Sequence, residues 1–129
     1  MQNPQTPMAL SHRPAVDDDS QRMAVAAARA ALEKKAEAVL ILDLRETSGY
    51  ADFLVIGSGS SDRQLEAIAE GVEKELVAQG RRLIGAEGQR GGRWVLLDFG
   101  DIVVHVFHQE ERSYYDLEGL WADAPRVAP

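Results

Sequence analysis

The sequence predicts a mixed α/β domain in which helices pack on a mixed sheet of about five strands. Three observations support this prediction. Short apolar runs of strand length occupy residues 39–42 and 53–56. Longer helix-forming segments precede and follow these runs. Residues 93–107 contain two apolar runs joined by a Gly-Asp turn and predict an antiparallel hairpin. With 129 residues, the chain fits one domain with one core.

The N-terminal residues predict a tail followed by a helix. Residues 1–19 contain three prolines and show no periodicity, so we expect a disordered tail before a domain of residues 20–129. Three aspartates and Ser20 can cap a helix and complement its dipole. The alanine-rich stretch that follows, to about Lys35, has no glycine or proline to interrupt a helix.

The second helix is predicted after the two apolar strands. Ser61 and Gln64 have the spacing of a capping box, and Gly80 has the position of a C-terminal cap. The residues between them with helical spacing are Leu65, Ile68, Ala69, Val72 and Leu76. A short strand is expected at residues 82–84. A last helical segment should hold Tyr114, Tyr115, Leu117, Leu120 and Trp121, and end before Pro125.

The first strand of the hairpin predicts two different faces. Val95, Leu97 and Phe99 can fill a core, whereas Trp94, Leu96 and Asp98 project to the opposite face. An unpaired carboxylate is costly to bury, so we expect this second face at the surface or at an interface. A tryptophan beside fixed charge is typical of a docking surface. Trp121 is expected to be buried.

The negative charge of the chain is concentrated in its C-terminal part and leaves two interpretations open. The formal net charge is −7, which does not favour direct binding of naked nucleic acid. Residues 98–123 hold seven acids against Arg112 alone, a local charge of −6. Such a surface can serve solubility alone, or it can steer the chain toward a basic protein.

The composition predicts a cytoplasmic protein without a cofactor or a membrane segment. The chain has no cysteine, which excludes disulfides and thiolate chemistry. No apolar run approaches the roughly 20 residues that span a bilayer. The N-terminus is polar and lacks the apolar core of a signal peptide.

The glycine-rich loop between Gly57 and Ser61 is the main candidate for chemistry. It precedes a helix and could bind an anion, but the lysine of a P-loop is absent and Asp62 replaces the third glycine of a dinucleotide motif. Catalytic acids at i and i+2 on one strand are also absent, because Arg45 follows Asp43 at that spacing. We therefore expect no enzyme; the alternative is a nucleotide-binding or nucleotidyltransferase-like enzyme that uses this loop.

The two histidines of the second hairpin strand do not predict a metal site. His105 and His108 are three residues apart, so they point to opposite faces of a strand. A hydrogen-bonded structural role for His105 is favoured, and a role at a partner surface comes second.

Several ordered blocks of the sequence resemble the ribosomal silencing factors of the RsfS/Iojap family, over about residues 24–127. The blocks are Leu42-Asp43-Leu44-Arg45, Ala51-Asp52-Phe53-Leu54-Val55-Ile56, Ser58-Gly59-Ser60-Ser61-Asp62-Arg63-Gln64, Glu87-Gly88, Trp94-Val95-Leu96-Leu97-Asp98, Gly100-Asp101-Ile102-Val103-Val104-His105-Val106-Phe107 and Tyr115-Asp116-Leu117-Glu118-Gly119-Leu120-Trp121.

The resemblance implies a fold related to nucleotidyltransferases without their catalytic acids. It also implies binding to the large ribosomal subunit, through a basic ribosomal protein of the L-fourteen family, and steric exclusion of the small subunit. Homodimers are a further implication. By position, Trp94 would be the apolar anchor with Leu96 beside it, Asp98 and Asp101 would pair with basic side chains, and His105 and Tyr115 would complete the surface.

Overall fold

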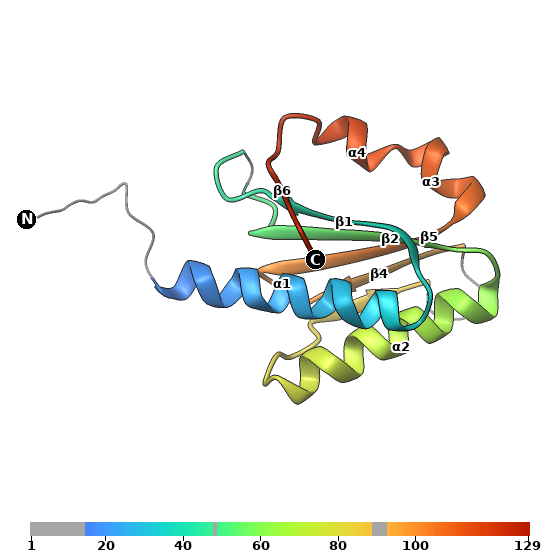
Figure 1. Ribbon diagram of the computed structural model, residues 1–129, viewed down its shortest axis with the longest axis horizontal. Coiled ribbons are helices and arrows are strands. Elements are labelled where there is room, and N and C mark those ends of the chain that lie inside the picture. The colour runs from blue at the N-terminus through green and yellow to red at the C-terminus, as the bar shows by residue number, and fades with distance from the viewer. Residues whose placement is uncertain (1–14, 48, 89–92) are drawn as a thin grey trace, which may run out of the picture.

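The computed structural model describes residues 15–47, 49–88 and 93–129, and within these ranges the side chains of residues 15–18, 113–115 and 117 are outside the description (Figure 1). The helices are α1 Ala15–Glu33, α2 Asp62–Ala78, α3 Gln109–Tyr115 and α4 Leu117–Leu120. The strands are β1 Glu37–Asp43, β2 Phe53–Gly59, β3 Gly85–Glu87, β4 Trp94–Asp98, β5 Ile102–His108 and β6 Arg126–Val127.

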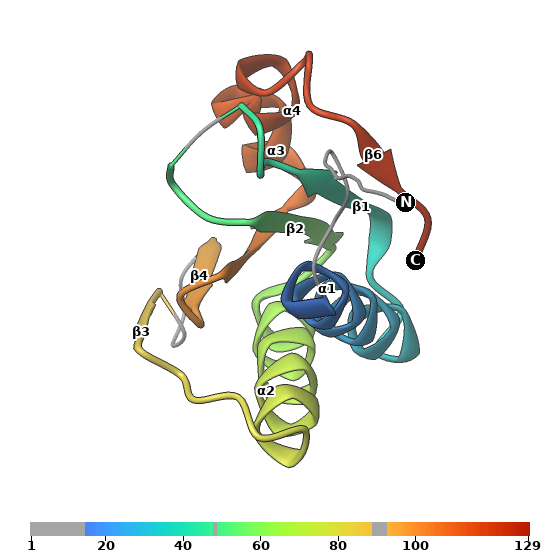
Figure 2. The ribbon, with the colours of Figure 1, turned by 90° about the vertical axis from the view of Figure 1, so that its left-hand side faces the viewer.

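All six strands form one mixed sheet in the order β3-β4-β5-β2-β1-β6. Strands β2 and β5 are parallel, and the other neighbours are antiparallel. Helices α1 and α2 cover one face of the sheet, as Figure 2 shows. On the other face, α3 and α4 lie over β1 and β2, and no described helix covers β4. The mixed α/β prediction is therefore confirmed.

Each face of the sheet has its own core. Between the sheet and helices α1 and α2, the core includes Phe53, Leu65 and Leu97. On the other face a smaller core contains Leu54 and Phe107, with partly buried side chains packed against it. Full burial of an aliphatic or aromatic side chain contributes roughly 1.5–3 kcal/mol, so both cores stabilise the fold.

Small residues let α1 lie close to the sheet and to α2. Its buried positions include Ala24, Ala27, Ala28 and Ala31. Alanine is also the best helix former, so propensity and packing favour the same element. The helix begins at Ala15, earlier than the capping residues 17–20 that the sequence suggests, and the division into tail and domain at residue 19 stays a prediction. Carboxylates in the first turns are compatible with helix there because they complement its dipole. Residues 1–14 of the predicted tail lie outside the described residues.

The cap of α2 follows the predicted pattern with one difference. The Ser61 hydroxyl accepts from the backbone N–H of Gln64 at 3.1 Å, as in a capping box. The Gln64 amide oxygen, however, accepts from the N–H of Ser60 at 2.7 Å. Its amide nitrogen also donates to the carbonyl of Lys35 at 2.9 Å, which joins the start of α2 to the end of α1.

Three predictions about the later elements need correction. The third strand is Gly85–Glu87 rather than residues 82–84, because pairing with β4 places Gly85 opposite Asp98 and leaves the Ile84 side chain exposed. The final helix is divided into α3 and α4 by the left-handed conformation of Asp116, at φ 48°. The short β6 raises the strand number to six, because residues 126–127 pair with β1.

Candidate functional site

The β4–β5 hairpin forms the floor of the candidate site. Its turn is closed by the N–H of Phe99, which donates to the carbonyl of Ile102 at 2.9 Å. Gly100 adopts φ 91° there, a conformation that favours glycine. Along β4, burial alternates as predicted: Val95 and Leu97 are buried, whereas Trp94, Leu96 and Asp98 are half-buried.

A groove of about 410 Å³ lies on this face of the hairpin. We call it the Trp94 groove, and its lining residues are Tyr50, Leu54, Trp94, Leu96, His105, Leu120 and Trp121. They come from the β1–β2 loop, three strands and the C-terminal helical region. Two of them are large exposed side chains, Tyr50 at 48% and Leu120 at 69%. The groove is therefore an apolar surface that remains accessible.

Stacked rings hold the centre of the groove. The ring centroid of Trp94 is 5.1 Å from that of Phe107 and 5.6 Å from that of His105. The Trp94 indole N–H donates to Nδ1 of His105 at 2.9 Å. On the opposite side of the groove, the Tyr50 ring stacks on Trp121 with a centroid distance of 6.4 Å. Trp121, which the sequence predicts to be buried, is partly exposed and forms a wall of the groove.

His105 is a buried structural histidine, as the sequence favours. Only 4% of the residue is exposed, and burial lowers its pKa to about 4. The imidazole is therefore neutral near pH 7. His108 has a separate role, because its Nδ1 accepts from the N–H of Glu110 at the start of α3. Among the described residues, no group of three or more histidine or carboxylate side chains could hold a metal ion.

Asp98 places a carboxylate on the same face of β4 as Trp94 and Leu96. One of its carboxylate oxygens accepts from the N–H of Gly100 at 2.8 Å, which fixes the side chain beside the turn. The pKa of Tyr50 is raised, first by burial and second by the charge of Asp98. The carboxylate is thus near enough to Tyr50 to influence the polar end of the groove.

Asp101 is not among the residues that line the groove, so its role at a docking surface stays a prediction. Its carboxylate accepts from Arg81 at 2.6 Å and from the Ser20 hydroxyl at 2.7 Å. Arg81 also pairs with Asp19 at 2.7 Å, and its pKa is raised first by the hydrogen bond that it donates to Asp101. Asp101 therefore fastens the hairpin turn to α1 and to the segment after α2.

The remaining predicted residues have different outcomes. Leu96 lines the groove and lies opposite His105 in the pairing of β4 with β5. Tyr115 lies in α3, but its side chain is outside the described residues. The sequence did not indicate Tyr50, Leu54 or Leu120, because nothing local links these residues to the hairpin.

The backbone of the glycine-rich loop is bound and packed by neighbouring side chains of the same chain. Gly57 to Gly59 form the buried end of β2, and Ser60 donates its N–H to Gln64. A Cβ on Gly59 would lie 3.3 Å from Gln64 Oε1 and Leu65 Cδ2, so this glycine permits close packing of α2. The geometry fits a turn and a helix cap better than a phosphate cradle.

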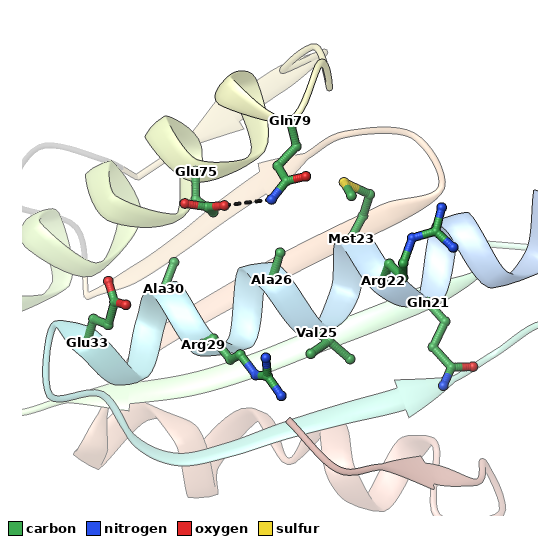
Figure 3. Close-up of a pocket in the computed structure, with 10 residues that line it drawn as sticks. All are labelled: Gln21, Arg22, Met23, Val25, Ala26, Arg29, Ala30, Glu33, Glu75 and Gln79. Atoms are coloured by element: carbon green, nitrogen blue, oxygen red, sulfur yellow. Dashed lines mark hydrogen bonds between the residues drawn. The ribbon is translucent and has the colours of Figure 1, made fainter.

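A larger hollow of about 660 Å³ lies between α1 and α2, on the other side of the molecule (Figure 3). Its lining residues are Gln21, Arg22, Met23, Val25, Ala26, Arg29, Ala30, Glu33, Glu75 and Gln79. Arginines and glutamates both border it, and Gln79 donates to Glu75 at 2.8 Å. The mixed charges select no class of ligand.

A family model described as "Ribosomal silencing factor during starvation" matches residues 17–129. The chain belongs to this RsfS family. A ribosomal silencing factor RsfS of Halalkalibacterium halodurans is 46% identical over 108 residues, which cover 84% of this chain and 92% of the relative. The ribosomal silencing factor RsfS of Bacillus subtilis is 48% identical over 99 residues, which cover 77% of this chain and 84% of the relative. The chloroplastic protein Iojap of Zea mays is 32% identical over 113 residues, covering 86% of this chain and 49% of its own length.

Two solved structures share the fold of this RsfS family member. A crystal structure of a Chromobacterium violaceum protein matches with a TM-score of 0.77 and 35% identity, covering 79% of this chain and 85% of that one. A Bacillus halodurans protein matches with a TM-score of 0.72 and 42% identity, covering 87% and 99%. Within the described parts of the chain, no helix has the length and apolar content needed to cross a membrane.

Proposed function

We propose that this RsfS family member binds the large ribosomal subunit through the Trp94 groove and sterically blocks the small subunit from joining, which represses translation in the cytoplasm. The partner in this proposal is a basic ribosomal protein of the L-fourteen family. The observation that carries the proposal is the accessible apolar groove beside β4, on the part of this sheet face that α3 and α4 leave uncovered.

The shape and composition of the groove support a protein partner. Trp94 is half-buried with its ring fixed between neighbours, so it can offer a rigid aromatic surface at little cost in conformational entropy. Leu96 and the exposed Leu120 extend this surface. Aromatic anchors surrounded by apolar contacts are typical of binding hot spots.

Charge supports a basic partner. Asp98 shares the face of β4 that carries Trp94 and Leu96, and the net charge of the chain is −7. An acidic rim attracts a basic surface at long range and suppresses binding to acidic proteins. The mechanism needs no chemical step, because a bound protein of this size excludes a subunit by its volume alone. A mechanism without a chemical step is consistent with a glycine-rich loop whose residues cap α2 instead of binding a phosphate.

The proposal predicts that the protein prevents subunit joining. Purified large and small subunits are mixed with the protein and separated on a sucrose gradient. We expect fewer joined ribosomes as protein is added, and co-sedimentation of the protein with the large subunit only. Raising the salt concentration should weaken the binding, since attraction between charges is screened. Full subunit joining at saturating protein would overturn the proposal.

A second copy of the chain is a competing occupant of the groove. The homodimer implied by the resemblance would lower the apparent affinity for the subunit if it closes over the same residues. Sedimentation equilibrium of the protein alone gives its oligomeric state. A dimer that Trp94→Ala dissociates, with subunit binding intact, would show that the groove serves the dimer instead.

Asp98 and Asp101 should respond differently to substitution by alanine. Asp98→Ala should weaken subunit binding about threefold to tenfold and reduce its salt dependence, because it removes a rim charge. Asp101→Ala should leave the affinity unchanged but lower the free energy of unfolding by about 1 kcal/mol, because Arg81 and Ser20 lose a half-exposed partner. For both variants, co-sedimentation measures binding and urea denaturation measures stability. If only Asp101→Ala weakened subunit binding, the roles proposed for Asp98 in binding and for Asp101 in stability would both be contradicted.

A further inference from the structure

The hydrogen bond between Trp94 and His105 determines which imidazole nitrogen carries a proton. The indole N–H is a donor only, so Nδ1 of His105, at 2.9 Å, must be the unprotonated acceptor. A neutral imidazole then has its proton on Nε2. This nitrogen lies 3.3 Å from the Tyr50 hydroxyl oxygen, which can accept that proton in a hydrogen bond. Trp94, His105 and Tyr50 therefore form one directed bridge across the groove.

His105 has almost no surface to offer a partner. The residue is 4% exposed, and its ring packs against those of Trp94 and Phe107, with centroid distances of 5.6 and 6.0 Å. Burial, which lowers its pKa to about 4, keeps the ring neutral, so Nδ1 remains an acceptor near pH 7. Any influence of His105 on binding must therefore pass through the side chains that it contacts.

We propose that His105 is a positioning residue of the Trp94 groove, which holds the indole in the orientation that the partner meets without touching the partner itself. The inference rests on the proposed function. A tryptophan ring without this acceptor has more rotamers available at the surface. Binding must then select one of them, which lowers affinity even when every contact residue is present.

Two substitutions of His105 separate positioning from stability. His105→Asn places an oxygen near the site of Nδ1 and can still accept from the indole, but it leaves a cavity where the ring was. His105→Phe fills that space and cannot accept. A purely structural role predicts that the less stable variant, His105→Asn, binds worse. Positioning predicts the reverse: we expect about a fivefold to tenfold loss of subunit affinity for His105→Phe and less than threefold for His105→Asn.

Nuclear magnetic resonance of the full chain tests the bridge without the ribosome. In the wild type, we expect His105 to show an unprotonated Nδ1 and a protonated Nε2. With Trp121→Phe as background, the single indole N–H signal of Trp94 should shift and exchange faster with solvent in His105→Phe. A protonated Nδ1, or an indole signal unchanged by His105→Phe, would overturn the inference even if neither variant were stable enough for binding studies.

The binding results distinguish the two proposals. If the wild-type chain does not bind large subunits, the proposed function fails. If the wild type binds and His105→Phe binds equally well, only the positioning role fails. Tyr50→Phe is the matched control at the far end of the bridge: it keeps the ring that stacks on Trp121 and should change the affinity less than His105→Phe does.

Discussion

Replacing Trp94 by alanine should weaken binding to the large ribosomal subunit about 30-fold or more, corresponding to ~2 kcal/mol or more for an aromatic hot spot. The substitution removes the central ring of the groove and its stacking on Phe107. It also removes the indole N–H that donates to Nδ1 of His105. Affinity is measured by co-sedimentation at several protein concentrations, and at two salt concentrations.

Two variants control for general effects of Trp94→Ala. Trp94→Phe keeps an aromatic ring but lacks the N–H, so we expect an intermediate loss of affinity. Val77→Ala shortens a side chain that is 52% exposed on α2, on the helical side of the sheet, and should bind like the wild type. The unfolding transition of each variant shows whether its fold is intact. Unchanged affinity in a folded Trp94→Ala protein would exclude the groove as the binding site.

Replacing Arg112 by alanine should lower the free energy of unfolding by about 3 kcal/mol, because a charged hydrogen bond to a buried hydroxyl and a partly buried ion pair are both lost. Arg112 is 8% exposed and donates to the buried Ser58 hydroxyl at 2.7 Å. It also binds the Glu118 carboxylate at 3.1 Å. These contacts fasten α3 and α4 to β2, so their loss should also loosen Leu120 and Trp121 and reduce subunit binding.

Arg93→Ala is the matched control for Arg112→Ala. Arg93 also pairs with two glutamates, at 2.7 and 2.8 Å, but its side chain is 45% exposed. Exposed ion pairs contribute little because water screens them, so we expect a much smaller change in the free energy of unfolding than for Arg112→Ala. Urea denaturation of both variants gives the comparison. Equal and small effects would show that the Arg112 contacts do not stabilise the fold.

The features that follow from local patterns could be predicted from the sequence. The alternation of β4 has a period of two residues, so it identified Trp94 and Leu96 as a face distinct from Val95 and Leu97. The capping serine of α2 and the turn at Gly100 are equally local. The structural histidine followed from the fact that residues three apart on a strand face opposite ways.

The features that depend on distant contacts could not be predicted in this way. The contacts of Asp101 with Arg81 and Ser20 could not be predicted, because these partners are 20 and 81 positions away in the sequence. Tyr50 reaches His105 across 55 positions. The strand β6 consists of two residues, too few for a periodic pattern. The role of Tyr115 stays a prediction.

The residues of the Trp94 groove extend from Tyr50 to Trp121, and Arg112 anchors the helices that complete it. Because no contiguous segment contains the groove, a chain presents it only after attaining its tertiary structure. If the groove binds the large subunit as proposed, an incompletely folded copy would leave subunit joining unaffected.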